Sequence, residues 1–221
     1  YCHGYGRREL SDVNGDGLPD FVKFGMKNMK VGLGQVVNGR HSYKPLQNWL
    51  GNAHHTREPA PTFKTTNDWQ DKDHPRMLCD VNGDGLPDIV GFHVNYTQVY
   101  INSGKSFASA ESKDYNGGWT TKFSWNDGWR AEDKHRRTCA DVNGDGMADI
   151  IGFGDSSTFV YVSTGRGFKP FATVNGFANN KWDFSEEIRG VQDLNGDGLA
   201  DIYGFESSGR ILAAMGTGTG F

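Results

Sequence analysis

The chain has 221 residues, including 31 glycines, and a formal net charge of −4 from 27 acidic and 23 basic residues. It contains no basic run of the kind that binds nucleic acid and no apolar stretch long enough to span a membrane. We therefore expect neither a nucleic-acid partner nor a membrane span.

The first clear element is a nine-residue acidic loop, Asp12-Val-Asn-Gly-Asp-Gly-Leu-Pro-Asp20. Oxygen side chains stand at loop positions 1, 3, 5 and 9, and the backbone carbonyl of position 7 is a further oxygen donor. Calcium accepts six to eight such ligands at roughly 2.3–2.6 Å in irregular geometry, whereas magnesium requires a strict octahedron. Glycines at positions 4 and 6 permit the sharp turn that brings these oxygens together. The loop therefore predicts a calcium site.

The same loop recurs three times further along the chain, so we predict up to four bound Ca²⁺ ions. The residue at position 7 would coordinate the ion through its backbone carbonyl oxygen. Because three carboxylates per loop repel one another, calcium is expected to stabilise the fold. The alternative is a set of acidic turns that bind nothing, since Asn-Gly and Asp-Gly also suit plain hairpins. The predicted ligands are Asp12, Asn14, Asp16, Leu18, Asp20, Asp80, Asn82, Asp84, Leu86, Asp88, Asp141, Asn143, Asp145, Met147, Asp149, Asp193, Asn195, Asp197, Leu199 and Asp201.

A short apolar stretch follows each loop, as in Ile89-Val-Gly-Phe92 and Ile150-Ile-Gly-Phe153. β-branched and aromatic residues followed by glycine predict a strand. A helix–loop–helix calcium site is excluded, because it needs Glu at loop position 12 and Lys or Gly stands there. Further strands are expected at 98–102 and 158–163, each followed by a turn that ends at a phenylalanine.

Three residue types recur at fixed offsets before the loops: an arginine four residues before, a histidine six before in two copies, and an aromatic residue eleven or twelve before. Aromatic faces and charged hydrogen-bond donors are what a sugar ring requires. The alternative is structural: Trp packs between repeats, and Arg braces a backbone carbonyl or a loop carboxylate. The predicted carbohydrate-binding residues are Trp69, His74, Arg76, Trp129, His135, Arg137, Trp182 and Arg189.

The repeats cover residues 1–221 as one domain, with units at about 1–68, 69–128, 129–181 and 182–221. Three or four antiparallel strands per unit predict an all-β fold, a four-bladed β-propeller with a calcium loop joining two adjacent strands of each blade. The last unit is one strand short. A closed ring of four blades is favoured, and a part of a longer propeller or two chains that complete each other are the alternatives.

The loops with the following Asp-Ile-x-Gly-Phe resemble the FG-GAP or VCBS repeats of integrin α-subunit propellers and many secreted proteins. The longer stretch from Gly128-Trp-Arg through His135-Arg-Arg137 to Asp149-Ile-Ile-Gly-Phe-Gly154 resembles the blade repeat of the Psathyrella velutina lectin family. This second resemblance is strongest in units two and three. It implies a propeller that binds calcium in its loops and sugars such as N-acetylglucosamine between neighbouring blades.

The sequence contains no nucleophile elbow, no zinc-protease motif and no phosphate-binding loop, so we expect no enzyme. We expect a secreted lectin, calcium-dependent or calcium-stabilised, that binds N-acetylglucosamine- or N-acetylgalactosamine-type glycans. Its expected partners are glycans or glycoproteins, and the sequence is compatible with an oligomer. The alternative is an integrin-like adhesion propeller or a toxin module with structural calcium alone. Cys2, Cys79 and Cys139 allow at most one internal disulfide of undetermined pairing, or buried free thiols.

Overall fold

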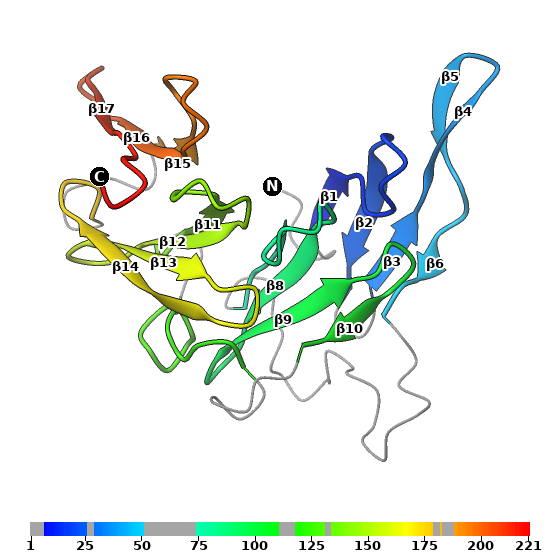
Figure 1. Cartoon of the computed structure of the whole chain (residues 1–221), viewed down its shortest axis with the longest axis horizontal. Helices are drawn as coiled ribbons and strands as arrows, with labels where there is room; N and C mark the ends of the chain where they lie inside the picture. The colour runs from blue at the N-terminus through cyan, green and yellow to red at the C-terminus, as the bar shows by residue number, and fades with distance from the viewer. Residues whose placement is uncertain are drawn as a thin grey trace.

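The computed structural model describes residues 7–25, 29–50, 74–110, 118–130, 134–178, 182 and 188–221. These residues form strands and turns without an α-helix, so none of them forms a helix that could cross a bilayer. The described strands build four antiparallel sheets that follow one another along an arc, and a fifth, two-stranded sheet (Figure 1). The prediction of an all-β propeller with four blades is confirmed.

In blades 2, 3 and 4 the strands follow one another in sequence, so neighbouring strands are joined as hairpins, whereas a separate hairpin lies between the third and fourth strands of blade 1. Blade 1 contains β1 (Arg8–Ser11), β2 (Asp20–Phe24), β3 (Met29–Gly32) and β6 (Gln47–Asn48). Blade 2 contains β7 (Arg76–Cys79), β8 (Asp88–Phe92), β9 (Thr97–Asn102) and β10 (Phe107–Ser109). Blade 3 contains β11 (Arg137–Ala140), β12 (Asp149–Phe153), β13 (Thr158–Ser163) and β14 (Phe168–Val174). Within the described residues, blade 4 contains β15 (Ile188–Gln192), β16 (Asp201–Phe205) and β17 (Ile211–Ala214).

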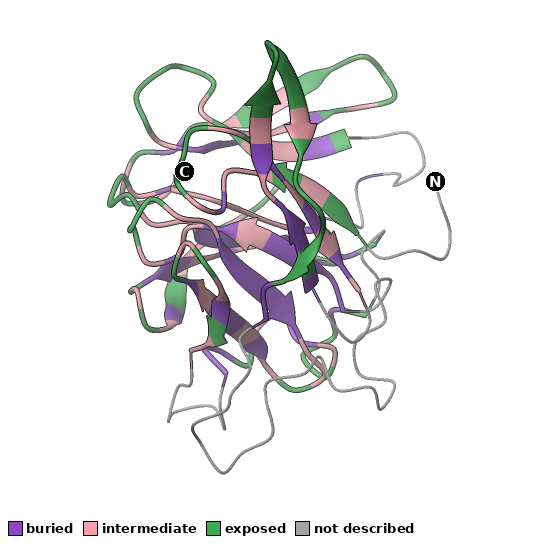
Figure 2. Cartoon of the chain, turned by 90° about the vertical axis from the view of Figure 1, so that its right-hand side faces the viewer, coloured by how far each residue is buried: buried purple, intermediate pink, exposed green. Residues whose placement is uncertain are grey.

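The acidic loop joins the first and second strands of every blade. In blade 3, Ala140 at the end of β11 pairs with Asp149 at the start of β12, so the last loop aspartate is also the first strand residue. The last blade has three strands, as expected. Blade 1 carries an additional hairpin, β4 (Gly34–Val37) and β5 (Arg40–Tyr43), which projects from the body of the molecule (Figures 1 and 2).

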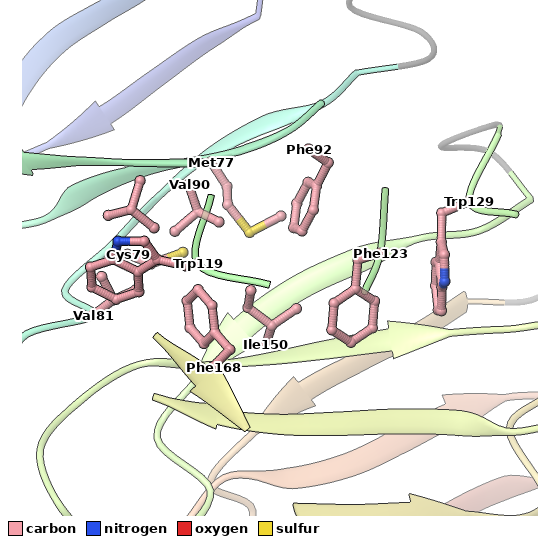
Figure 3. Close-up of a cluster of buried hydrophobic side chains, with 11 residues drawn as sticks. Met77, Cys79, Val81, Val90, Phe92, Trp119, Phe123, Trp129, Ile150 and Phe168 are labelled. Atoms are coloured by element: carbon pink, nitrogen blue, oxygen red, sulfur yellow. The ribbon is translucent and has the colours of Figure 1, made fainter. Parts of the chain in front are cut away.

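The apolar core lies between the blades, in three clusters that each combine two neighbouring blades. Successive residues of a second strand face opposite neighbours, because side chains alternate along a strand. Thus Ile150 packs in the cluster shared with blade 2, whereas Ile151 packs in the cluster shared with blade 4. Figure 3 shows Ile150 among Phe92, Met77 and Phe123. Burial against both neighbours explains why these strands are continuously apolar.

A disulfide joins the first strands of blades 2 and 3. It links Cys79 on β7 to Cys139 on β11, with their Cα atoms 6.3 Å apart. The pairing that the sequence left open is therefore assigned, and the alternative of free thiols is wrong for these two cysteines. Cys2 lies outside the described residues.

The first and last blades stand at opposite ends of the arc (Figure 1). Apolar side chains at both ends, including Leu10 in blade 1 and Phe205 in blade 4, are exposed. The favoured closure of four blades into a ring is therefore wrong for the described residues, because closure would bury these side chains. The arc leaves one face of blade 1 and one face of blade 4 uncovered.

Candidate functional site

The shape of each acidic loop is set by its first aspartate. In the first loop, Asp12 Oδ1 accepts the N–H of Gly15 at 2.7 Å and of Asp16 at 3.2 Å, and Oδ2 accepts that of Gly17 at 2.7 Å. Both glycines have positive φ, 75° and 83°, a conformation that residues with a Cβ rarely adopt. The first aspartates of the other three loops accept the N–H groups of both glycines in the same way.

The last aspartate of each loop is buried and connects the loop to the third strand of its blade or to the residues just after that strand. Asp149 Oδ2 accepts the N–H of Val142 at 3.0 Å, and Oδ1 accepts that of Ser163 at 2.8 Å. The pKa of Asp149 is raised to about 7, chiefly by burial and to a smaller extent by the nearby carboxylates of Asp145 and Asp141, while the two hydrogen bonds lower it. Asp88 in the second loop has a pKa raised to about 7 for the same reasons. Such a carboxylate favours a nearby cation.

The donor set of the loops fits calcium. Among the described residues, no three His, Cys, Asp or Glu side chains converge as a ready metal cluster, because the loop carboxylates accept backbone amides instead. Each carboxylate oxygen that accepts one N–H keeps a second lone pair for an ion. The asparagine at position 3 lies beside the aspartate at position 5, with 2.9 Å from Asn14 Nδ2 to Asp16 Oδ2. This geometry is suited to calcium. The four calcium sites themselves stay a prediction.

The loops of neighbouring blades are connected to one another. The N–H of Ala148 in the third loop donates to the carbonyl of Asp80 in the second at 2.6 Å, and Ala200 in the fourth loop donates to Asp141 in the third at 2.9 Å. The position 7 side chain of each later loop also lies against the first glycine of the loop before it, as Met147 does at Gly83. A cation in one loop would therefore stabilise the blade interface as well.

The repeated arginines join each blade to the one before it. Arg137 Nη1 donates to the carbonyls of Phe123 at 3.0 Å and Trp129 at 3.3 Å, and its guanidinium lies 4.8 Å from the ring centroid of Phe92 in blade 2. Arg76 and Arg189 repeat this arrangement, each with a carbonyl acceptor and with the corresponding phenylalanine of the preceding blade beneath the guanidinium. All three arginines are buried. The structural role considered for them is therefore present.

The repeated tryptophans pack on the second strand of their own blade. Trp129 and Trp182 are buried, and a Cβ at Gly152 or Gly204 would overlap their rings. The Gly-Phe pair of the repeat thus has two packing functions: the glycine admits the tryptophan, and the phenylalanine receives the arginine of the next blade. Trp69 lies outside the described residues. Sugar contacts by these tryptophans and arginines stay a prediction, and the structure places these side chains inside the blade interfaces.

The two histidines are buried beside aromatic rings. His135 Nε2 lies 3.2 Å from Asp155 Oδ1, and the same carboxylate oxygen lies 2.9 Å from Lys134 Nζ. The His135 ring stands 5.6 Å from that of Trp129. His74 contacts Trp125 at 5.7 Å between ring centroids.

Burial gives His135 a testable pH dependence. It lowers the pKa of His135, with smaller lowering by Lys134 and Arg137, and Asp155 opposes the shift. The folded pKa therefore lies below the unfolded value near 6.5, so the stability associated with the neutral ring is complete above about pH 6.5 and is lost as the pH falls. We expect the difference in free energy of unfolding between wild type and His135→Gln to shrink from pH 8 to pH 5 in urea titrations. A difference independent of pH would contradict this.

A pocket of about 260 Å³ opens where the segment 118–130 meets the outer strands of blade 3. Lys122 Nζ lies 4.6 Å from the ring centroid of Phe159 and 3.1 Å from Asp127 Oδ2 at this pocket. Phe159 and Tyr161 share one face of β13, because they are two residues apart on a strand. No repeat offset points to this pocket, although the alternation Phe159-Val-Tyr161 is a signal for it that the sequence contains. Its lining residues are Lys122, Phe159, Tyr161, Pro170, Phe171, Ala172 and Thr173.

A second group of aromatic side chains lies around the turn between β8 and β9 of blade 2. His93 stacks on Tyr96 with ring centroids 4.9 Å apart, and Arg130 lies 5.7 Å from the Trp125 ring centroid. Asn126 Nδ2 donates to Asn95 Oδ1 at 2.7 Å beside them. These residues come from loops and from 118–130, so no repeat offset points to them.

Comparisons with known proteins agree with this architecture. Residues 141–204 match the family model of the FG-GAP-like repeat. The fold is similar to an Agrocybe aegerita lectin described for specific recognition of non-reducing terminal N-acetylglucosamine, with 28% sequence identity and a TM-score of 0.76 over 99% of this chain. It also matches a chain of the TcdB2-TccC3 crystal structure in fold alone, at 14% identity and a TM-score of 0.50, over 95% of this chain and 14% of that one. No curated protein sequence matches the chain.

The chain spans half the length of the Agrocybe aegerita lectin chain. The resemblance to FG-GAP repeats and to lectin propellers is confirmed by these matches.

Proposed function

We propose that this protein is a lectin that binds glycans ending in an N-acetylated amino sugar, in a pocket between blades. The observation that supports it most is the similarity to the N-acetylglucosamine-recognising lectin over almost the whole chain. We infer no enzymatic activity, because the residues that recur in every repeat are engaged in loop hydrogen bonds and in packing between blades.

The pocket at Lys122 has the chemistry that a sugar requires. Phe159, Tyr161 and Phe171 supply apolar ring surface for the hydrophobic side of a pyranose, and the Lys122 ammonium is a strong donor toward hydroxyl or acetamido oxygens. Its volume of about 260 Å³ is slightly below the roughly 300 Å³ at which small-molecule sites usually begin. We infer that it accepts one terminal sugar ring.

Calcium has a supporting role in this proposal. None of the residues that line the pocket belongs to an acidic loop. The loops instead connect one blade to the next, and calcium there would hold blade 3, whose outer strands line most of the pocket, against its neighbours. We therefore propose four loop ions that stabilise the protein without contacting the sugar. The disulfide between blades 2 and 3 supports an extracellular location, since such bonds persist in oxidising compartments.

A glycan array tests this function. Labelled protein is applied in calcium and, separately, in chelator, and circular dichroism checks that the protein is folded in each buffer. We expect binding concentrated on glycans with terminal N-acetylglucosamine or N-acetylgalactosamine. Absence of binding to every glycan by folded, calcium-loaded protein would exclude the proposal, and a protein-interaction propeller would then be the better account.

Two substitutions test the pocket itself. Lys122→Ala removes the charged donor, and Thr173→Trp fills the pocket from the exposed side of β14. We expect each to weaken sugar affinity about tenfold or more. For Lys122→Ala the reason is that a hydrogen bond to a charged group contributes roughly 1.5–3 kcal/mol. For Thr173→Trp the reason is that the indole ring would take the space of the sugar. Isothermal titration calorimetry measures the effect.

The matched control is Lys134→Ala, which removes another paired lysine outside the pocket and should leave affinity unchanged. Unchanged affinity in both pocket variants would place the sugar elsewhere.

A further inference from the structure

The sequence contains a single N-glycosylation sequon, Asn95-Tyr96-Thr97. It lies at the turn between β8 and β9, and Asn95 is exposed. Asn95 Oδ1 accepts a hydrogen bond from Asn126 Nδ2 at 2.7 Å, which holds the amide group at the surface. The nitrogen that would carry a sugar therefore belongs to an exposed and oriented side chain.

The third residue of the sequon is covered by the segment 118–130. Thr97 is completely buried, and its Oγ1 donates to the carbonyl of Lys122 at 2.9 Å. The N–H of Trp125 donates to the carbonyl of His93 at 3.1 Å, so the same segment also holds the start of the turn. Because a sequon requires the hydroxyl group of its third residue, a sugar has to be added before this segment packs on blade 2.

Aromatic rings lie on both sides of the sequon. His93 stacks on Tyr96 with ring centroids 4.9 Å apart, and Trp125 follows in the segment that packs on the turn. All three side chains are half-buried, so part of each ring is open to solvent. Such rings pack against the apolar face of a pyranose. The first sugar of a glycan on Asn95 would therefore meet apolar surface beside its point of attachment.

The corresponding turn of blade 3 provides a comparison. The strand pairing next to the turn is the same in both blades, and Thr158 is buried as Thr97 is. At the position of the asparagine, blade 3 has the exposed Ser156, and at the position of the histidine it has Gly154. The buried threonine is thus common to both blades, whereas the asparagine and the histidine ring distinguish blade 2 from blade 3.

We propose that Asn95 carries an N-linked glycan whose first N-acetylglucosamine packs on the rings of His93, Tyr96 and Trp125. In the transfer, Asn95 Nδ2 bonds to C1 of the N-acetylglucosamine of an oligosaccharide linked to a polyprenyl diphosphate. The bond from C1 to the diphosphate breaks, the polyprenyl diphosphate leaves, and Nδ2 loses one proton. The proposal rests on the extracellular location proposed above, since this transfer belongs to the secretory pathway. It does not depend on the sugar pocket at Lys122.

Secretion of the chain from a eukaryotic cell tests the site. We expect the intact mass to exceed that of the polypeptide by one glycan, which a peptide-N-glycosidase removes while converting Asn95 to aspartate. Peptide mapping by mass spectrometry locates the conversion. Asn95→Gln should abolish the additional mass, and Asn175→Gln, at another exposed asparagine in a turn, should leave it unchanged. A secreted and folded protein with Asn95 unmodified would overturn the proposal.

The packing of the first sugar has a separate measurement. An endo-β-N-acetylglucosaminidase leaves one N-acetylglucosamine on Asn95, and the peptide-N-glycosidase removes it. We expect the protein with this sugar to melt about 2 °C or more above the protein without it, because of the contact with the aromatic rings. Differential scanning calorimetry measures the shift.

The matched control moves the glycan to blade 3. In an Asn95→Gln background, Ser156→Asn completes an Asn-Ser-Thr sequon at the same position of the next blade, where Gly154 and Ser157 replace the histidine and the tyrosine. Removal of the sugar creates an aspartate at both sites, so the comparison cancels the effect of the new charge. The sugar in blade 3 should give no comparable increase in melting temperature. No increase at Asn95, or an equal increase at both sites, would contradict packing on the aromatic group.

Discussion

Removal of calcium will lower the melting temperature of this protein by at least about 5 °C. A site saturated at a hundred times its Kd contributes about 2.7 kcal/mol, and in a protein of this size one kcal/mol corresponds to roughly 2–4 °C. The effect is large because each loop holds three aspartates. In the second and third loops, the buried aspartate has a raised pKa. The loops are also connected from blade to blade, so that each ion would stabilise an interface as well. Differential scanning calorimetry in calcium and in excess chelator measures it.

A charge-removing variant separates calcium binding from general destabilisation. Asp145→Asn keeps the shape of the side chain and removes one carboxylate from the third loop, so it should reduce the calcium-dependent rise in melting temperature. In chelator the same variant should melt no lower than wild type, because repulsion within the loop is relieved. Glu206→Gln, outside the loops, should keep the full response to calcium. An identical melting temperature with and without chelator in wild type would refute the calcium assignment.

Loss of the disulfide will produce the second large effect. The bond between Cys79 and Cys139 closes a chain segment with a sequence separation of 60, for which loop entropy predicts about 4 kcal/mol of stabilisation. It also joins blade 3, whose outer strands line most of the pocket, to blade 2. We expect Cys79→Ala with Cys139→Ala to melt roughly 8–16 °C lower than wild type. Urea denaturation should show a matching decrease in the free energy of unfolding.

The control for this experiment is Cys2→Ser, which keeps the bond and should melt as wild type does. Mass spectrometry of the unreduced protein locates the bond independently. Free thiols at both positions, or unchanged stability after complete reduction, would show that the bond does not form.

Much of the fold was predictable because its determinants are local. Glycines at two positions in each loop require positive φ, and the apolar stretches after the loops are long enough only for strands, so the loops and the second strands were placed correctly. The disulfide depends instead on how blade 2 meets blade 3, which spacing along the chain does not encode. Closure of the ring depends on the same packing, and the exposure of Phe205 shows that it was predicted wrongly.

The candidate sugar site shows a different limit. Trp129, His135 and Arg137 recur at fixed offsets because every blade interface needs the same packing, and a repeat pattern does not separate a packing role from a binding role. The pocket residues have no such pattern. Lys122 belongs to the non-repeating segment 118–130, and its position over Phe159 arises only when that segment folds against blade 3. Sequence periodicity therefore indicated the framework better than the site.

A crystal structure of calcium-loaded protein soaked with N-acetylglucosamine tests the central claim most directly. We predict one sugar ring in the pocket between Lys122 and Tyr161 and a calcium ion in each of the four acidic loops. Loops without calcium, or a sugar bound away from this pocket or not at all, would contradict a calcium-stabilised lectin with its site between segment 118–130 and blade 3.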